Sequence, residues 1–253
     1  MEKENVSMTA FAPQEMLILA GGAGTRLRSL VSDVPKPMAP VAGRPFLEYL
    51  LRYWIDQGIL RFVLSLGYMG DSIKEHFGTR YGNAEISYVQ ESSPLGTGGA
   101  IRMALQEINW NSGHILLANG DTWFEVDLTA LVHDACQHDL PLTIALKAIE
   151  VNDRYGAVNV DDCGFVTAFG VQRKRNCLIN AGCYLLEIQA LLVLLQDYPK
   201  TFSFEDDLLT VLVTKKLISS SIQNRVFLDI GIPPDYQKAN AVVGCYKFKG
   251  DIA

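Results

Sequence analysis

A glycine-rich loop at the end of an apolar run most constrains what this 253-residue chain can form. The segment reads Leu17-Ile-Leu-Ala-Gly-Gly-Ala-Gly-Thr-Arg-Leu27, and Pro35-Lys36-Pro37 follows it closely. Glycines let backbone N–H groups turn toward an anion because they lack a Cβ atom and tolerate positive φ. Arg26 would add a guanidinium fork for phosphate oxygens, and Lys36 would add a point charge. The pattern predicts a binding site for a nucleoside triphosphate.

The same loop has two other interpretations. Glycine-rich turns after strands are common, and one alone is weak evidence. A dinucleotide-binding fold would need a third glycine where Leu27 stands, and Pro35, Pro37 and Pro40 disfavour the long helix needed there. A nicotinamide-linked dehydrogenase would also need an acidic ribose ligand about 20 residues beyond the loop, where Glu48 lies inside a predicted helix. That function therefore ranks last.

The first half of the chain alternates between strand and helix patterns. Apolar or alternating runs predict strands at residues 16–20, 61–66, 84–90 and 114–118. Helical spacing predicts helices at 46–59, 69–77, 97–108 and 127–138, the last with Asp127 as its N-cap. This order predicts an α/β fold with a Rossmann-like, mostly parallel sheet flanked by helices. The loops after Ala20, Gln90 and Ala118 should then meet at one crevice.

From Leu142 the pattern changes to short strand-like runs, which predict a smaller mixed or antiparallel lobe. Strands are expected at residues 142–149, 156–160, 165–169, 178–186 and 226–229, and helices at 187–195, 204–213 and 234–243. We predict a loosely held extension over residues 1–14 and a single domain over 15–253. Its two lobes would span about 15–140 and about 141–245.

Composition excludes several classes of protein. The net charge is −6, so no basic excess points to nucleic acid or to a membrane surface. No run approaches the roughly 20 apolar residues of a membrane helix, and the charged start Met1-Glu-Lys-Glu-Asn5 is unlike a signal peptide. The five cysteines form no CxxC pair and are expected to be reduced thiols. We expect a cytoplasmic protein.

Five motifs in order resemble one family. The first loop with Pro35-Lys36-Pro37 resembles the signature of sugar-1-phosphate nucleotidyltransferases. The later motifs are Pro94-Leu-Gly-Thr-Gly-Gly-Ala100, Asn119-Gly-Asp121, Asn180-Ala-Gly182 and Asp229-Ile-Gly-Ile-Pro233. The resemblance implies a GT-A-like nucleotidyltransferase fold whose second lobe binds the sugar. It also implies transfer of a nucleoside monophosphate from a nucleoside triphosphate to a sugar 1-phosphate, with release of pyrophosphate and no covalent protein intermediate.

The resemblance assigns the two glycine-rich segments to the nucleotide. Gln90 or Glu91 would read the edge of the base, Arg26 would hold the leaving pyrophosphate, and Lys36 would hold the α-phosphate or the incoming phosphate. The alternative for the second segment is an ordinary glycine turn that caps a helix. The implied nucleotide-binding residues are Leu19, Ala20, Gly21, Gly22, Gly24, Thr25, Arg26, Gln90, Glu91, Leu95, Gly96, Thr97, Asn119 and Gly120.

Asp121 and Asp229 are the candidate metal ligands. Each comes at the end of an apolar run, and Mg²⁺ prefers one or two carboxylates together with phosphate oxygens and waters. The alternative for Asp121 is an Asx-turn. The resemblance implies that the two aspartates grip one Mg²⁺ ion that touches both substrates, and that Arg26, Lys36 and Asp121 are catalytic.

On the sugar side, the resemblance implies contacts from Tyr155, Gly156, Asn180 and Gly182, with Asn180 bonding ring hydroxyls. Glu205 and Asp206 also match a sugar-contact segment, or they form a solvated helix face. The alternative for the glycines is simple strand turns.

One departure from the family affects the sugar phosphate. The family usually has a Glu-Lys pair after the strand ending at Phe169, and its lysine contacts the phosphate. Here Val171-Gln172 stands in that place, followed by Arg173-Lys174-Arg175. Either Lys174 or Arg173 substitutes through a shifted turn, or the contact is lost and the basic residues form a solvated turn.

The ending of the chain, Phe227-Leu-Asp-Ile-Gly-Ile-Pro-Pro-Asp-Tyr-Gln-Lys-Ala239, resembles the D-glycero-D-manno-heptose 1-phosphate guanylyltransferases within this family. GTP and that heptose 1-phosphate are therefore the favoured substrates, for surface polysaccharide synthesis. Mannose-1-phosphate guanylyltransferases and thymidylyl- or uridylyl-transferring relatives stay open, as does a non-catalytic nucleotide-sugar binder. Neither nucleic acid nor a membrane is expected as a partner, and a homo-oligomer is possible.

Overall fold

The structure is a computed structural model that describes residues 12–22, 27, 31, 33–151, 154–172 and 174–249. Of the predicted extension, residues 1–11 lie outside the described residues. So do Gly24, Thr25 and Arg26 of the first glycine-rich loop, and Arg173 of the basic turn. The division into two lobes stays a prediction.

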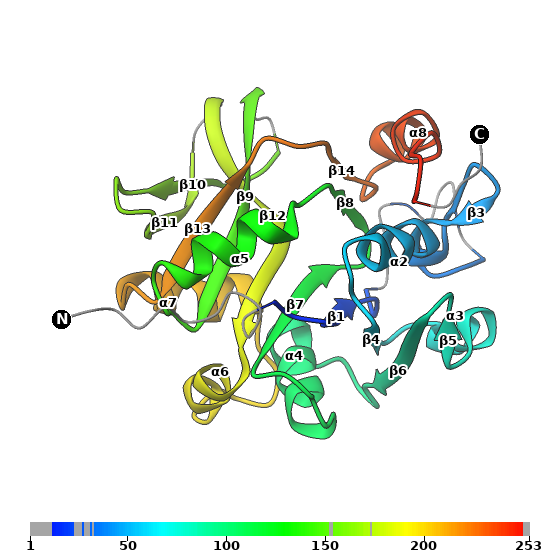
Figure 1. Cartoon of the computed structure of the whole chain (residues 1–253), viewed down its shortest axis with the longest axis horizontal. Helices are drawn as coiled ribbons and strands as arrows, with labels where there is room; N and C mark the ends of the chain where they lie inside the picture. The colour runs from blue at the N-terminus through cyan, green and yellow to red at the C-terminus, as the bar shows by residue number, and fades with distance from the viewer. Residues whose placement is uncertain are drawn as a thin grey trace.

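The first half of the chain forms a parallel sheet (Figure 1). Strands β1 (Glu15–Leu19), β4 (Arg61–Leu66), β6 (Ala84–Gln90) and β7 (His114–Asn119) lie in the order β7-β1-β4-β6, and β5 (Arg80–Tyr81) closes the edge antiparallel to β6. These strands are parallel because a helix returns the chain between them. The predicted strand bounds at 61–66 and 84–90 are those observed.

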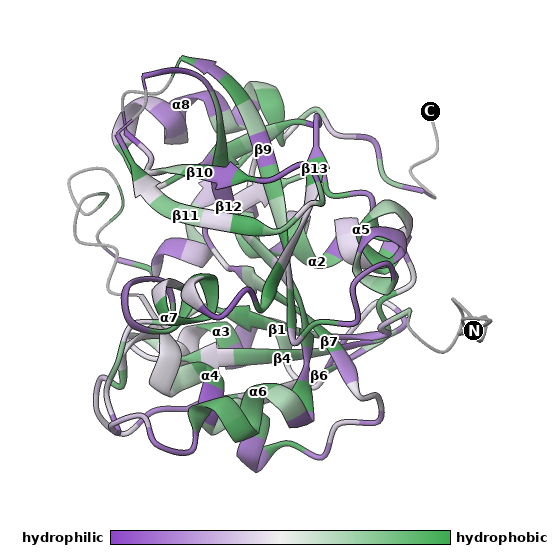
Figure 2. Cartoon of the chain, turned by 90° about the vertical axis from the view of Figure 1, so that its left-hand side faces the viewer, coloured by the Kyte–Doolittle hydropathy of each residue, from purple (hydrophilic) through white to green (hydrophobic). Residues whose placement is uncertain are grey.

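Helices cover both faces of this sheet (Figure 2), which explains why its strands are apolar throughout. In β1, Met16 and Ile18 pack in one core with α2 (Phe46–Asp56), α3 (Gly70–Phe77) and α5 (Leu128–Cys136). Leu17 points to the other face, where α4 (Gly96–Glu107) and α6 (Ile188–Leu195) pack. Asp127 caps α5 as predicted, since its side chain accepts a hydrogen bond from the N–H of Ala130.

The second half adds mostly antiparallel strands to the same sheet. They are β9 (Leu142–Val151), β10 (Ala157–Val160), β11 (Val166–Val171), β12 (Arg175–Glu187) and β13 (Ile218–Gln223). The long strand β12 pairs antiparallel with β7, β9 and β10 and so joins the two halves. A π-helical turn η2 (Phe204–Leu209) leads into α7 (Thr210–Thr214). The predicted α/β fold, with a mostly parallel sheet and a mixed second part, is confirmed.

A small separate sheet connects distant parts of the chain. Strand β8 (Thr122–Phe124) pairs antiparallel with β14 (Phe227–Asp229), and Asp229 lies opposite Thr122. Helix α8 (Pro233–Val242) follows with prolines in its first turn. Near the start of the chain, the 3₁₀ turn η1 (Lys36–Met38) leads into a hairpin of β2 (Pro40–Val41) and β3 (Arg44–Pro45). None of the described helices is both long and apolar enough to cross a membrane.

Candidate active site

The loops at the carboxyl ends of the parallel strands touch one another. A Cβ atom on Gly21 would lie 2.9 Å from the backbone nitrogen of Gly67, so the loops after β1 and β4 need glycine at their contact. Oε1 of Glu91, after β6, would lie 2.8 Å from a Cβ on Gly67. The N–H of Gly120, after β7, donates to the carbonyl of Leu19 at 2.9 Å. These contacts place the loops of the predicted crevice side by side.

The second glycine-rich segment packs against the loop that follows α6. The N–H of Gly98 donates to the carbonyl of Phe202 at 3.0 Å, and the N–H of Phe202 donates to the carbonyl of Leu95 at 3.1 Å. A Cβ on Gly98 would lie 2.1 Å from the Phe202 ring, and Gly96 has a φ of +70°. The glycines therefore serve this packing, in addition to the nucleotide contact predicted for Gly96.

The two candidates for reading the base differ in their surroundings. Gln90 accepts a hydrogen bond from Lys74 of α3 and is exposed. Oε2 of Glu91 accepts a hydrogen bond from the N–H of Leu95 at 2.8 Å, which fixes the carboxylate beside the second glycine-rich segment. Glu91 is therefore the more rigidly held of the two.

Thr97 connects this segment to η2. Its hydroxyl donates to Oε2 of Glu205 at 3.1 Å and accepts from the N–H of Phe204 at 2.8 Å. Burial raises the pKa of Glu205, and the nearby charges of Asp206 and Asp121 raise it further. Glu205 is thus a partly buried carboxyl close to Asp121, rather than part of a solvated helix face. Its π-helical turn is of a kind often found at functional sites.

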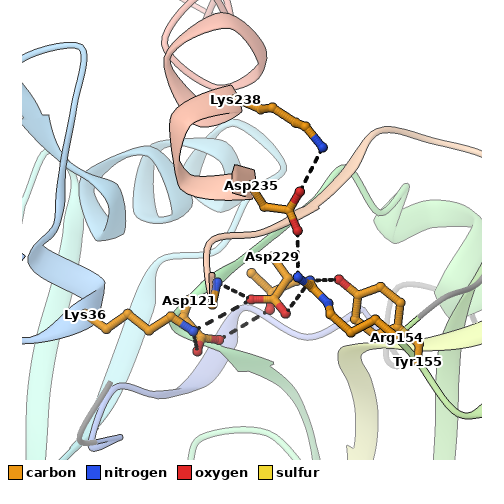
Figure 3. A network of polar contacts seen from close by, with 9 residues as sticks. Lys36, Asp121, Arg154, Tyr155, Asp229, Asp235 and Lys238 are labelled. Atoms are coloured by element: carbon orange, nitrogen blue, oxygen red, sulfur yellow. Dashed lines mark hydrogen bonds and ion pairs between the residues drawn. The ribbon is translucent and has the colours of Figure 1, made fainter. Parts of the chain in front are cut away.

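Asp121 and Asp229 converge although they are far apart in sequence (Figure 3). The N–H of Ile230 donates to the carbonyl of Asp121 at 3.1 Å, next to the pairing of β8 with β14. Both carboxylates face the ammonium group of Lys36, which forms an ion pair with Oδ2 of Asp121 and lies 3.7 Å from Oδ1 of Asp229. One cation therefore faces both acidic side chains.

Gly231 holds Asp229 in this position. Its N–H donates to Oδ1 of Asp229 at 2.6 Å. A Cβ on Gly231 would lie 2.7 Å from that same oxygen and 3.1 Å from Nζ of Lys36. A larger residue would push the carboxylate away from the lysine, which gives the Asp-Ile-Gly motif a physical reason.

The arrangement fits a divalent cation. Among the described residues, no group of three or more histidine, cysteine or acidic side chains gathers as a metal cage. Mg²⁺ needs only one or two carboxylates when phosphate oxygens and waters complete its shell. Lys36 already shows that a positive charge is stabilised between Asp121 and Asp229. These two carboxylates could hold Mg²⁺ at that position.

Arg154 is a further charged residue in the site, which the sequence did not single out. Its Nη2 lies 3.0 Å from Oδ2 of Asp229, and its Nη1 lies 2.7 Å from Oδ2 of Asp235 in the first turn of α8 (Figure 3). It also donates to the hydroxyl of Tyr155. Lys238 pairs with the other oxygen of Asp235 at 2.9 Å. Its ion-pair partners Asp229 and Asp235 come from a distant part of the chain, so no local pattern could have revealed this role.

The predicted sugar residues lie on β12 and beside β10. Nδ2 of Asn180 donates to the hydroxyl of Tyr184 at 2.7 Å, and Oδ1 accepts from the N–H of Gly182 at 2.9 Å. Gly182 has a φ of +69°, and a Cβ there would lie 2.3 Å from Nδ2 of Asn119. These contacts form an irregularity in β12 next to β7. Asn180 thus has partners within the chain, and its contact with a sugar stays a prediction.

The remaining sugar-side residues, Tyr155, Gly156 and Lys174, have different surroundings. The Tyr155 ring packs edge-on against Phe227 at 5.6 Å, next to Asp229. A Cβ on Gly156 would lie 2.8 Å from the Cα of Gly170, so this glycine serves a close approach of two strands. Lys174 is exposed in the turn between β11 and β12.

Comparisons with known proteins agree with this geometry. Residues 15–244 match the family model described as Nucleotidyl transferase. The D-glycero-alpha-D-manno-heptose 1-phosphate guanylyltransferase of Aneurinibacillus thermoaerophilus is 40% identical over 228 residues, which cover 89% of this chain and 96% of that protein. The corresponding protein of Campylobacter jejuni is 39% identical, over 88% of this chain and 96% of its own length.

A solved structure shares the fold. The crystal structure of HddC from Yersinia pseudotuberculosis complexed with GMP-PN superposes with a TM-score of 0.77 at 35% identity, and covers 90% of this chain and 98% of that one. The family match spans the glycine-rich loop, both aspartates and the sugar-side residues alike. The chain therefore belongs to the nucleotidyl transferase family and is a nucleotidyltransferase.

Proposed function

We propose that this enzyme transfers GMP from GTP to D-glycero-α-D-manno-heptose 1-phosphate and releases pyrophosphate. The observation that carries the proposal is the convergence of Asp121 and Asp229 on the ammonium group of Lys36. The relatives from Aneurinibacillus thermoaerophilus and Campylobacter jejuni are named for this reaction, and the Yersinia pseudotuberculosis protein was crystallised in complex with GMP-PN.

The reaction brings two polyanions together, so orientation and charge neutralisation supply most of the catalysis. An oxygen of the sugar 1-phosphate attacks the α-phosphorus of GTP. A new P–O bond forms, the bond to the bridging oxygen of the β-phosphate breaks, and its electron pair leaves with pyrophosphate. No protein nucleophile is required.

Each group of residues in the site would have its own role in this reaction. The N–H groups of the loop that starts at Gly21 would cradle the phosphates, with Arg26 on the leaving pyrophosphate. Lys36 would leave the carboxylates and bind a phosphate oxygen. Asp121 and Asp229 would hold Mg²⁺, which supplies charge neutralisation and orientation of the phosphates when bound.

Glu91 is suited to guanine. A carboxylate can only accept hydrogen bonds, and the Watson–Crick edge of guanine presents N–H donors. The hydrogen bond from Leu95 to Oε2 leaves Oε1 of Glu91 free of that contact and directed toward the Gly67 loop. This arrangement is compatible with guanine as the base, and the choice of GTP over a pyrimidine nucleotide rests on the relatives that are named for guanylyl transfer.

A matrix of nucleoside triphosphates against sugar 1-phosphates, scored by pyrophosphate release with Mg²⁺ present, tests the proposal. The expected result is fastest turnover with GTP and the heptose 1-phosphate. Faster turnover with mannose 1-phosphate, or with a thymidine or uridine triphosphate, would overturn the proposed substrates. Binding of the nucleotide sugar without turnover of any pair would instead indicate a non-catalytic binder.

A further inference from the structure

Two positively charged side chains, Lys36 and Arg154, face the carboxylates of Asp121 and Asp229. The sequence analysis identified Lys36 but not Arg154. We infer that Arg154 binds the phosphate of the sugar 1-phosphate, once a divalent cation has taken its place on Asp229. The inference rests on the proposed function and names the residue that receives the acceptor phosphate.

Lys36 and Arg154 approach the carboxylates from opposite sides (Figure 3). Lys36 comes from η1, shortly after the first glycine-rich loop, and pairs with Asp121. Arg154 lies between β9 and β10 and contacts Oδ2 of Asp229 at 3.0 Å. The charges of the two carboxylates are thus balanced by two single positive charges.

A divalent cation on the carboxylates changes this balance. It would supply both positive charges by itself, and both side chains would then face a like charge. Lys36 and Arg154 would therefore turn from the carboxylates toward other anions. In this enzyme, the other anions of the site are the phosphates of the substrates.

Arg154 has a second anchor that keeps it in the site during this exchange. Its Nη1 lies 2.7 Å from Asp235, and its guanidinium lies 4.6 Å from the centre of the Tyr155 ring. Asp235 is also paired with Lys238, so it does not neutralise Arg154 completely. Nη2 can then leave Asp229 while Nη1 stays on Asp235. A guanidinium held by Asp235 and the Tyr155 hydroxyl, with one N–H released from Asp229, is well suited to a phosphate oxygen.

The position of Arg154 indicates that it binds the phosphate of the acceptor sugar rather than the nucleotide. It directly precedes Tyr155 and Gly156, on the side of the carboxylates away from Lys36. The other candidate for the acceptor phosphate, Lys174, lies exposed in the turn between β11 and β12. The observed contacts therefore favour Arg154 over Lys174.

The kinetic test compares Arg154→Gln and Arg154→Lys with Lys174→Gln, the other candidate for the acceptor phosphate, and with the exposed control Lys215→Gln. It uses GTP and the sugar 1-phosphate that the wild type turns over fastest. A lost charged hydrogen bond is worth about 1.5–3 kcal/mol, so Arg154→Gln should raise the KM for the sugar 1-phosphate roughly 10- to 100-fold. The KM for GTP should stay close to the wild-type value. Arg154→Lys should recover part of the loss, and Lys174→Gln should raise this KM far less than Arg154→Gln does. The exposed control Lys215→Gln should resemble the wild type.

A binding measurement separates a phosphate contact from a structural role. Calorimetry with Mg²⁺ and a non-transferable GTP analogue would compare the affinity for the sugar 1-phosphate with that for the same sugar without phosphate. Arg154→Gln should weaken only the phosphorylated ligand. Asp235→Asn, which keeps the guanidinium but removes the negative charge of its anchor, should weaken the affinity less.

Three results would overturn the inference. They are an unchanged KM for the sugar 1-phosphate in Arg154→Gln, an equal loss of affinity for the sugar without phosphate, and a loss that falls on Lys174→Gln instead. A wild type that turns over no sugar 1-phosphate would contradict the proposed function itself. An active wild type with an unaffected Arg154→Gln variant would contradict the role of Arg154 alone.

Discussion

Nζ of Lys36 lies 3.7 Å from Oδ1 of Asp229, and the same ammonium group pairs with Asp121. The relationship depends on the pairing of β8 with β14, which carries Asp229 next to Asp121. It also depends on Gly231, which leaves room for the lysine between the two loops. Three segments that are distant in the sequence therefore contact one another at the ammonium group of Lys36.

Lys36→Gln should separate the two roles of the lysine. Loss of a positive group from the phosphate site should lower kcat/KM by about 10²–10³-fold. Without Lys36, Asp121 and Asp229 repel each other until a cation binds, so Mg²⁺ should raise the melting temperature of the variant more than that of the wild type. Pyrophosphate release and thermal unfolding with and without Mg²⁺ measure the two effects.

Lys215→Gln is the control for this prediction, because Lys215 is an exposed lysine in the turn that follows α7. It should change neither quantity. A Lys36→Gln variant with wild-type turnover, or with a smaller response to Mg²⁺ than the wild type, would show that the lysine does not compete with the cation.

Gly182→Ala should damage the junction between β12 and β7. Gly182 has a φ of +69°, and the new Cβ would lie 2.3 Å from Nδ2 of Asn119. A strained backbone of this kind costs of order 1–3 kcal/mol, so the free energy of unfolding should fall by about that amount or more. Urea unfolding measures it, with Gly113→Ala as the control because a Cβ on Gly113 would meet nothing within 4 Å. Equal stabilities of the two variants would contradict the packing described here.

The elements that the sequence predicted well are those with a strong local pattern. The apolar runs of β4 and β6 gave their observed bounds, and Asp127 capped α5 as its position predicted. Strand β13 was missed because its residues 219–221 are all serine, although the strand is buried. Those serines find partners far along the chain, such as the hydroxyl of Thr143 at 2.7 Å from Ser219. A polar buried strand has no signature in the local pattern.

In the site too, the residues that stand in a local motif were predicted, and the contacts that depend on the tertiary fold were not. Lys36, Asp121 and Asp229 stand in motifs and were proposed from the sequence, and the structure brings them together. Strand β8 is only three residues long, so the pairing that joins the aspartates was not foreseen. Arg154 has no motif of its own, because its partners Asp229 and Asp235 come from a segment that only the tertiary fold places beside it.

Glu205→Gln should change how stability depends on pH. Burial raises the pKa of Glu205 above its ordinary value of 4.5, so the folded state disfavours the charged carboxylate. Below pH 4.5 the carboxyl is protonated in both folded and unfolded chains. The stability that the folded state gains from its raised Glu205 pKa is then fully present. It is lost as the pH rises through the raised pKa of the folded state. The variant should therefore gain stability relative to the wild type as the pH rises toward neutrality.

Unfolding free energies measured across this pH range test the prediction, with Glu107→Gln as an exposed control. Glutamine can still accept the hydrogen bond from Thr97, so the comparison isolates the charge. A wild type that gains stability relative to Glu205→Gln as the pH rises would contradict the direction of the shift.

Arg102→Met should loosen the loop that supports the second glycine-rich segment. The Arg102 guanidinium donates to the carbonyls of Tyr198 at 2.7 Å and Pro199 at 2.8 Å, and the loop then reaches Gly98 through Phe202. Hydrogen bonds from a charged group are worth about 1.5–3 kcal/mol, so the free energy of unfolding should fall by that order. Arg102→Lys should restore little, because lysine lacks the planar fork. Wild-type stability in Arg102→Met, measured by urea unfolding beside the exposed control Arg80→Met, would refute the anchoring role.

Binding of Mn²⁺, followed by electron paramagnetic resonance with a non-transferable GTP analogue present, decides whether Asp121 and Asp229 share one divalent ion. We expect Asp121→Asn and Asp229→Asn each to weaken Mn²⁺ binding by at least about tenfold and both to retain the fold. The exposed control Asp162→Asn should bind Mn²⁺ like the wild type. Wild-type affinity for Mn²⁺ in either Asp121→Asn or Asp229→Asn would contradict the claim that the two carboxylates share one divalent ion.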